Sequence, residues 1–161
     1  MSYQEKRTIT SLVSGLLVLV SYAIYAFVKL GSDSFDPNNL EFWAITMLIF
    51  IGIGIVATII IQIVFHILMA ITIAIKEREK DEAVITKTIE AEMVEDERDK
   101  LIELKSSRIG FAFVGFGFVL GLIFLAFGYS AALMVNILFL SYSIGSLCEG
   151  LGSLHYYRKG L

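Results

Sequence analysis

Two long uncharged runs constrain this chain more than any other feature. The residues from Phe42 to Ile75 contain no aspartate, glutamate, lysine or arginine, and neither do those from Ile109 to Cys148. A helix needs about 20 apolar residues to cross the hydrocarbon core of a bilayer. With 57% hydrophobic residues, the chain keeps too little polar sequence for a second, soluble domain. The sequence therefore predicts a single all-α membrane domain over residues 1–161.

The apolar sequence divides into four predicted spans. The run from Ile9 to Val28 is too long for the apolar part of a secretory signal, and no small-residue cleavage site follows it, so we interpret it as a retained span. The run that begins at Ile109 would reach about 60 Å as one helix. Gly128 and Ser130 are expected to divide it, because glycine ends helices and serine caps them. The result is a four-helix transmembrane bundle with spans at about 9–30, 42–75, 109–127 and 131–157.

The second span is expected to begin near Asp36, an N-cap residue followed by proline in the first helical position. Trp43 then lies where an interfacial aromatic residue is expected. The uncharged run from Phe42 would be about 51 Å long, which exceeds a bilayer core of about 30 Å. The helix is therefore expected to tilt, to break near Gly52 and Gly54, or, as we favour, to protrude into the charged segment that follows.

Basic residues predict the orientation in the membrane. All lysines and arginines except Lys29 fall near the N-terminus, in residues 76–108, or near the C-terminus. Short loops rich in these residues stay in the cytosol. We therefore expect a multi-pass protein of the cell membrane with both termini cytosolic and the lipid bilayer as its partner. The net charge of −3 gives no reason to expect a nucleic-acid partner.

Residues 76–108, called the stalk below, contain neither glycine nor proline and are rich in helix-forming residues. They are expected to form helical cytosolic extensions of helices two and three. The acidic residues between Glu90 and Asp99 lack a calcium-loop glycine and an alternating ligand pattern. This favours a solvated, salt-bridged surface over a divalent-cation site.

The second half of the chain carries a motif. Glu95-Asp96-Glu97-Arg98-Asp99 precedes an apolar span, Lys105 follows, and the chain ends Tyr156-Tyr157-Arg158-Lys159-Gly160. From about residue 90 onward it resembles a family of uncharacterised small prokaryotic four-span membrane proteins, with a juxtamembrane Asp-Glu-Arg motif, a later lysine and a terminal Tyr-Arg-Arg-Gly. Ser106 and Lys159 depart from that pattern, which has alanine and arginine. The resemblance implies the four-span fold and, because such genes lie beside helix-turn-helix regulators, a sensory or regulatory setting.

The charged motif residues have two interpretations, which stay open. Asp96, Glu97, Arg98 and Lys105 could form ion pairs between the stalk helices or between two subunits. Alternatively, the basic side chains are cytosolic anchors that reach lipid phosphates. Anchoring explains the basic residues and leaves the acidic ones unexplained.

Gly117 and Gly121 form a G-x-x-x-G strip in the third span, where another helix can approach closely. Packing against a span of the same chain is the default expectation. A homodimer is the alternative, because four short helices alone make a small bundle.

Glu149 and His66 are the ionisable residues that stand out inside the predicted spans, at nearly the same depth from the cytosolic ends of their helices. Thr58 and Gln62 share a helical face with His66, because the three are spaced four residues apart. If this face meets the fourth span, an intramembrane polar seam results, and charged groups in a span suggest a functional site. The alternative is that Glu149 lies near the cytosolic interface and His66 is a packing residue.

Catalysis is not expected. His155 would lie about 10 Å closer to the cytosol than His66, so the two cannot share a haem, and Cys148 is two turns from His155, too far for one zinc. The sequence has no known hydrolase, zinc-protease or phosphate-loop motif, so no catalytic residue, metal or cofactor is predicted. We favour a non-enzymatic membrane accessory or sensor protein whose stalk contacts a cytosolic protein partner. The alternative is a small proton-coupled transporter or channel that uses Glu149 and His66.

Overall fold

The computed structural model describes residues 3–76 and 96–159. In this part of the chain it has four helices: α1 (Tyr3–Leu30), α2 (Leu40–Lys76), α4 (Glu97–Ala126) and α5 (Ala131–Lys159). Each is long and apolar enough to cross a membrane. The predicted all-α fold with four candidate spans is thereby confirmed.

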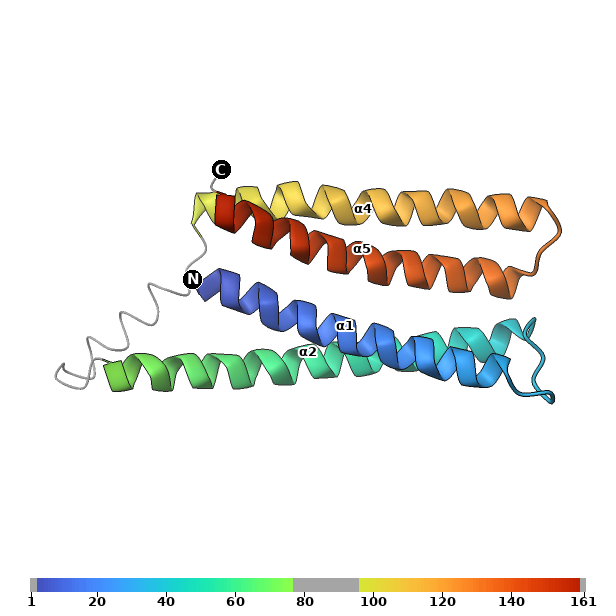
Figure 1. The fold of residues 1–161 in the computed structure, drawn as a ribbon, viewed down its shortest axis with the longest axis horizontal. Helices are drawn as coiled ribbons and strands as arrows, with labels where there is room; N and C mark the ends of the chain where they lie inside the picture. Colours follow the sequence, from blue (N-terminus) through green and yellow to red (C-terminus); the bar gives the residue numbers. More distant parts are fainter. Residues whose placement is uncertain (1–2, 77–95, 160–161) are drawn as a thin grey trace.

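The four helices run lengthwise beside one another (Figure 1). Helix α5 packs along α4 over the most extensive contact, and it also contacts α1 and, to a smaller extent, α2. Helix α1 packs against α2 as well. The connections 31–39 and 127–130 lie at one end of the bundle, called the loop end below (Figure 1). The first residues of α1 and α4 and the last residues of α5 lie at the other, called the terminal end.

Helix α2 begins at Leu40, so the predicted start near Asp36 is wrong. The Asp36 carboxylate accepts a hydrogen bond from the backbone N–H of Asn38 at 2.9 Å and builds a turn before the helix. Asn39 is the capping residue, because its side-chain oxygen accepts from the backbone N–H of Phe42 at 2.9 Å. The sequence contains two residues able to cap, and the later one does so.

The predicted division between the last two spans is confirmed. Gly128 adopts a φ of 87°, the left-handed conformation that glycine allows at a helix end. The N–H of Tyr129 donates to the carbonyl of Phe124 at 3.1 Å, and the two rings lie 5.2 Å apart, centroid to centroid. Ser130 then caps α5, because its hydroxyl accepts from the backbone N–H of Leu133 at 3.3 Å.

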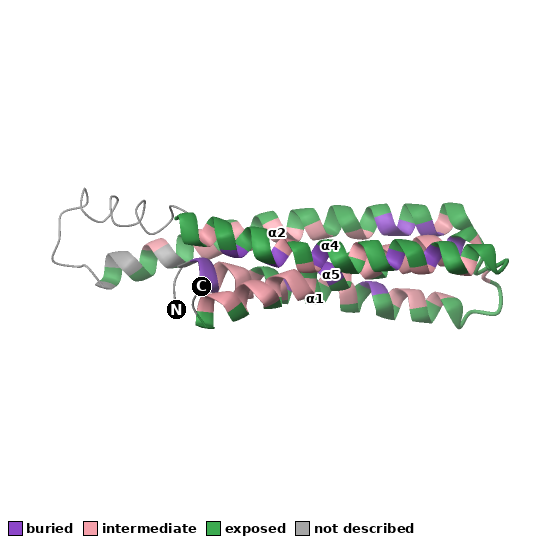
Figure 2. Ribbon diagram, turned by 90° about the horizontal axis from the view of Figure 1, so that it is seen from above, coloured by how far each residue is buried: buried purple, intermediate pink, exposed green. Residues whose placement is uncertain are grey.

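The hydrophobic core lies toward the loop end. Its buried members are Tyr22, Trp43, Met47 and Ala132, and partly buried aromatic side chains surround them. The Trp43 indole N–H donates to the carbonyl of Pro37 at 2.9 Å, so this ring is held under the connection that precedes α2. Along the rest of the bundle the outer faces are exposed (Figure 2). Exposed apolar faces suit a bundle surrounded by lipid chains, which are as apolar as leucine.

Candidate functional site

A polar cavity of about 310 Å³ lies toward the terminal end. All four helices contribute polar side chains to its lining: Gln4, Arg7, Thr8 and Ser11 from α1, Gln62 from α2, Asp99 and Glu103 from α4, and Ser146, Glu149, Ser153 and Tyr157 from α5. Three acidic residues and one arginine therefore line one space. This concentration of polar groups makes the cavity the candidate functional site.

Glu149 lies between α5 and α4. A Cβ atom added at Gly110 would lie 2.7 Å from the Glu149 carboxylate oxygen Oε2, so the two residues are in direct contact. Gly110 is only two residues beyond Arg108, the last charged residue of α4. Glu149 is therefore level with the start of the uncharged part of α4, where the interface interpretation expects it. Among the described residues, no hydrogen bond or ion pair reaches its carboxylate.

The structure brings together part of the predicted seam. Gln62 and Glu149 line the same cavity, whereas Thr58 lines two neighbouring spaces. His66 is not among the residues that line the polar cavity, and its ring lies 6.2 Å from that of Phe65. The reason is that α1 packs against both α2 and α5 and supplies Arg7 and other polar side chains where a direct contact of those two helices was expected.

Sequence reasoning missed the α1 part of the cavity, although the sequence contains a signal for it. Gln4, Arg7, Thr8 and Ser11 follow the spacing i, i+3, i+4, i+7, which places them on one face of a helix. A polar stripe at the start of an apolar span predicts a polar neighbour. Arg7 was interpreted only as one of the basic residues that set the orientation, and its polar neighbours on the same face were not considered.

The motif residues of the stalk lie at the start of α4. The Asp96 carboxylate accepts from the backbone N–H of Asp99 at 2.7 Å, and the Asp99 carboxylate accepts from that of Asp96 at 3.2 Å. This reciprocal pair is a capping box, so both acidic residues have a local role in starting the helix. Glu97 is exposed in the first turn.

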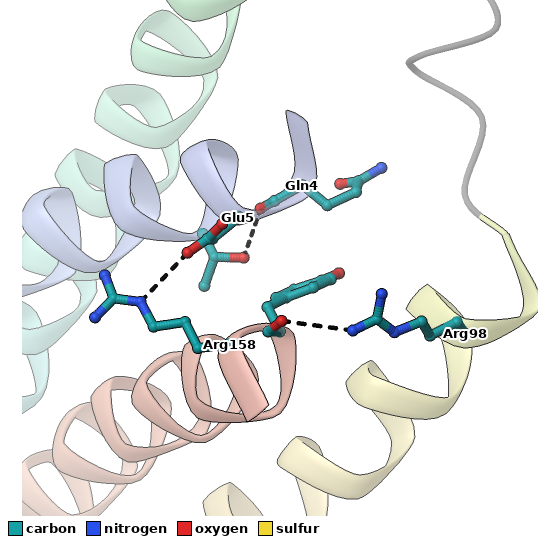
Figure 3. Close-up of polar contacts among 6 residues, drawn as sticks. Gln4, Glu5, Arg98 and Arg158 are labelled. Carbon is teal, nitrogen blue, oxygen red and sulfur yellow. Dashed lines mark hydrogen bonds and ion pairs between the residues drawn. The ribbon is translucent and has the colours of Figure 1, made fainter. Parts of the chain in front are cut away.

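The basic motif residues reach α5. An Arg98 guanidinium N–H donates to the carbonyl of Tyr157 at 3.4 Å (Figure 3). The Lys105 ammonium lies 6.0 Å from the centre of the Tyr156 ring. The motif thus joins the start of α4 to the end of α5. The remainder of the predicted stalk, residues 77–95, lies outside the described residues, and so does half of the acidic cluster, Glu90, Glu92 and Glu95.

An ion pair joins α1 to α5 at the same end. The Arg158 guanidinium donates to the Glu5 carboxylate at 3.3 Å (Figure 3). Glu5 is only 8% exposed, whereas the Arg158 side chain is mostly exposed. For residues 3–76 and 96–159, no group of three or more histidine, cysteine or acidic side chains is placed to hold a metal ion.

The glycine strip faces α5. A Cβ added at Gly117 would overlap the Ser141 side chain, and one at Gly121 would lie 3.0 Å from the Cγ of Met134. Both glycines are buried in the contact between α4 and α5. The strip therefore serves packing within the chain, the default expectation, and the homodimer stays a prediction.

Comparison with protein-family models, with curated proteins and with solved structures finds no match to this chain. The resemblance to small four-span prokaryotic proteins stays a prediction. The functional argument therefore depends on the geometry of the polar cavity.

Proposed function

We propose that this protein is a non-enzymatic sensor or accessory protein of the cell membrane that takes up a positively charged group in its polar cavity. The observation that carries the proposal is the set of three carboxyl groups, those of Asp99, Glu103 and Glu149, beside the one guanidinium of Arg7. A cleft lined mainly by one sign of charge raises the local concentration of the opposite sign. Cationic groups are therefore the expected ligands.

The two ends of the bundle favour binding over conduction. The polar lining comes from the terminal end, whereas the loop end is filled by aromatic packing. There the Tyr22 ring lies 5.3 Å from Phe50 and 4.4 Å from Phe139, centroid to centroid. A channel needs a path that an ion can follow through the whole bundle. A cavity at one end suits a sensor.

The position of the cavity suggests how occupancy would reach a partner. We place the terminal end in the cytosol, because nearly all lysines and arginines of the sequence lie at that end or in the stalk. Asp99 and Glu103 of the cavity belong to the first turns of α4, which form the last part of the stalk. A ligand that neutralises these two carboxylates would change the conformation of the start of α4. The stalk, a helical cytosolic extension, would pass this change to the protein partner that it contacts.

A proton-coupled transporter is the second candidate. The specific observation in its favour is that Glu149 lines both the polar cavity and a second cavity of about 230 Å³ formed by α4 and α5. A carboxyl group open to two spaces could pass a proton between them. His66, the predicted partner in that mechanism, does not line the polar cavity.

Charge-selective labelling tests the first proposal. A cysteine at Ser153, in a Cys148→Ser background, should react with a cationic methanethiosulfonate at least about tenfold faster than with an anionic one in inverted vesicles, after each rate is divided by the rate of the same reagent with a small thiol in solution. Adding Glu103→Gln and Glu149→Gln should reduce this ratio, because both carboxyl groups line the same cavity. Ser34→Cys, in the 31–39 connection, should be labelled in intact cells.

Equal rates of the two reagents at Ser153→Cys, or a faster anionic reagent, would contradict uptake of a cationic group. Labelling of Ser153→Cys from outside intact cells would contradict the orientation. Proton flux into vesicles that Glu149→Gln abolishes would favour the transporter over the sensor.

A further inference from the structure

An apolar groove adjoins the polar cavity. It has a volume of about 370 Å³ and is lined by α1, α2 and α5, with Val18, Phe50 and Phe139 among its apolar side chains. Gly15, Ser146 and Leu147 line both spaces. The groove and the cavity therefore adjoin each other at these three residues.

The two spaces follow the polarity of one bilayer leaflet. The cavity lies beside charged residues of the first turns of α4, whereas the groove extends along α2 from Ile59 to Phe50, about 13 Å at 1.5 Å per residue. Along the bundle axis, Glu149 lies at the boundary between the cavity and the groove, level with the start of the uncharged part of α4. A polar space at this level followed by an apolar one has the profile of a lipid headgroup followed by its acyl chain.

We propose that the cavity and the groove together bind one phospholipid with an amine-bearing headgroup, whose ammonium lies among the carboxyl groups and whose acyl chain lies in the groove. This inference rests on the proposed function, since it names the cationic group that the cavity takes up. An ammonium group donates up to three hydrogen bonds, and carboxylates accept them. A headgroup without the amine would leave the cavity's acidic groups unmatched.

The headgroup phosphate also has a place. Arg7 lines the same cavity as the carboxyl groups, and guanidinium groups bind phosphate oxygens well. Gln4 lines the cavity too, is 8% exposed, and its buried amide nitrogen Nε2 has no hydrogen-bond partner among the described residues. A buried donor of this kind requires an acceptor, which a phosphate oxygen would supply. The site therefore matches a zwitterionic headgroup and not a simple cation alone.

A second protein helix is a poorer occupant than an acyl chain. A helix with its side chains is about 10–12 Å across and needs a long, continuous face to pack. The groove is short. At the end nearer the polar cavity it is lined by the polar side chain of Ser146, and Glu149 follows in the cavity. An acyl chain attached to a polar headgroup fits both parts at once.

Native mass spectrometry of the purified protein tests the proposal. The protein is mixed with phosphatidylethanolamine and phosphatidylglycerol of equal chain length. We expect at least about fivefold preference for phosphatidylethanolamine, the discrimination that one headgroup charge provides near a membrane surface. Glu103→Gln combined with Glu149→Gln should reduce the preference toward one.

Two glycines of α2 offer a matched pair for the groove. Gly54 lines it, and a Cβ there would lie 3.8 Å from Val18, so Gly54→Leu should fill the groove. Gly52 lies half a turn away and a Cβ there would meet nothing within 4 Å, so Gly52→Leu is the control. Retained phosphatidylethanolamine should fall several-fold in Gly54→Leu and stay unchanged in Gly52→Leu. Ser143→Leu, in the groove wall contributed by α5, should have the same effect and guards against misfolding of the first variant.

Equal retention in Gly54→Leu, Ser143→Leu and Gly52→Leu would overturn the proposal, and so would a preference for phosphatidylglycerol. If either occurs while the cationic reagent still reacts faster at Ser153→Cys, the lipid inference fails and the proposed function stands. If the reagent preference is absent, the proposed function fails as well.

Discussion

The loop end and the terminal end of this bundle contain different kinds of side chains. At the loop end, buried Tyr22, Trp43 and Met47 pack against further aromatic rings. The connection 127–130 ends at Ser130, which caps α5. At the terminal end, the same helices surround polar side chains, and the polar contacts between them include the ion pair of Glu5 with Arg158 and the hydrogen bond from Arg98 to the carbonyl of Tyr157. The difference teaches that aromatic packing concentrated at one end leaves room for polar side chains between the same helices at the other.

The polar groups of the two ends also differ in how they are satisfied. At the loop end, the Tyr22 hydroxyl donates to the side-chain oxygen of Asn136 at 2.6 Å, and the Asn136 amide donates to the carbonyl of Ala132 at 2.8 Å. At the terminal end, the buried amide nitrogen of Gln4 has no hydrogen-bond partner among the described residues. Satisfied groups make a rigid structure, whereas unsatisfied ones are typical of a site.

Removing the Tyr22 ring should have the largest effect on the stability of the bundle. Tyr22 is 1% exposed and contacts two further aromatic rings. Tyr22→Ala should lower the free energy of unfolding by about 3–5 kcal/mol, because it leaves a large cavity and an unpartnered Asn136. Denaturation in detergent micelles, followed by circular dichroism, measures the loss.

The control for Tyr22→Ala is Phe116→Ala, in which a 68% exposed ring on α4 is removed. Its loss should be below about 1 kcal/mol, since surface substitutions usually have small effects. If the two variants lose the same stability, the loop end is not the packed core described above.

The contact of α4 with α5 runs through both ends, and Gly117 tests whether it is within one chain. Gly117→Leu should destabilise the fold by about 1–3 kcal/mol, because its side chain would overlap Ser141. Gly115→Leu is the matched control, since a Cβ at Gly115 meets nothing within 4 Å. Unfolding and molecular mass in detergent should be measured together. A Gly117→Leu protein of unchanged stability but lower mass would instead assign the strip to a contact between two copies.

Local sequence signals predicted most of the fold. Hydropathy gave the four helices, and Gly128 with Ser130 marked the turn before α5, because a left-handed glycine and a capping hydroxyl act within a few residues of themselves. The start of α2 was less determined. Asp36 and Asn39 both have capping side chains, and the choice depends on the turn that the Asp36 carboxylate builds with Asn38.

The candidate site was predictable only in part. Depth along a helix follows from residue counting, which predicted Glu149 and His66 near one level. In the structure Gln62, one turn from His66 on α2, lines the cavity with Glu149 instead. Which helices face one another depends on their rotation and crossing, which no single span encodes. For this reason α1, rather than His66 of α2, supplies the cation of the cavity, and only the stripe from Gln4 to Ser11 indicated that face.

Breaking the ion pair between Glu5 and Arg158 should have the smallest effect on stability, and it tests how firmly the terminal end is held. A double-mutant cycle of Glu5→Gln and Arg158→Gln should show a coupling energy of at most about 1 kcal/mol, because the Arg158 side chain is 67% exposed and water competes for it. Unfolding in detergent at low and high salt measures the coupling, which should decrease with salt. A coupling above about 2 kcal/mol that salt does not weaken would mean that α1 and α5 are clamped at this end. The terminal end would then be held as firmly at this contact as the loop end is by its aromatic packing.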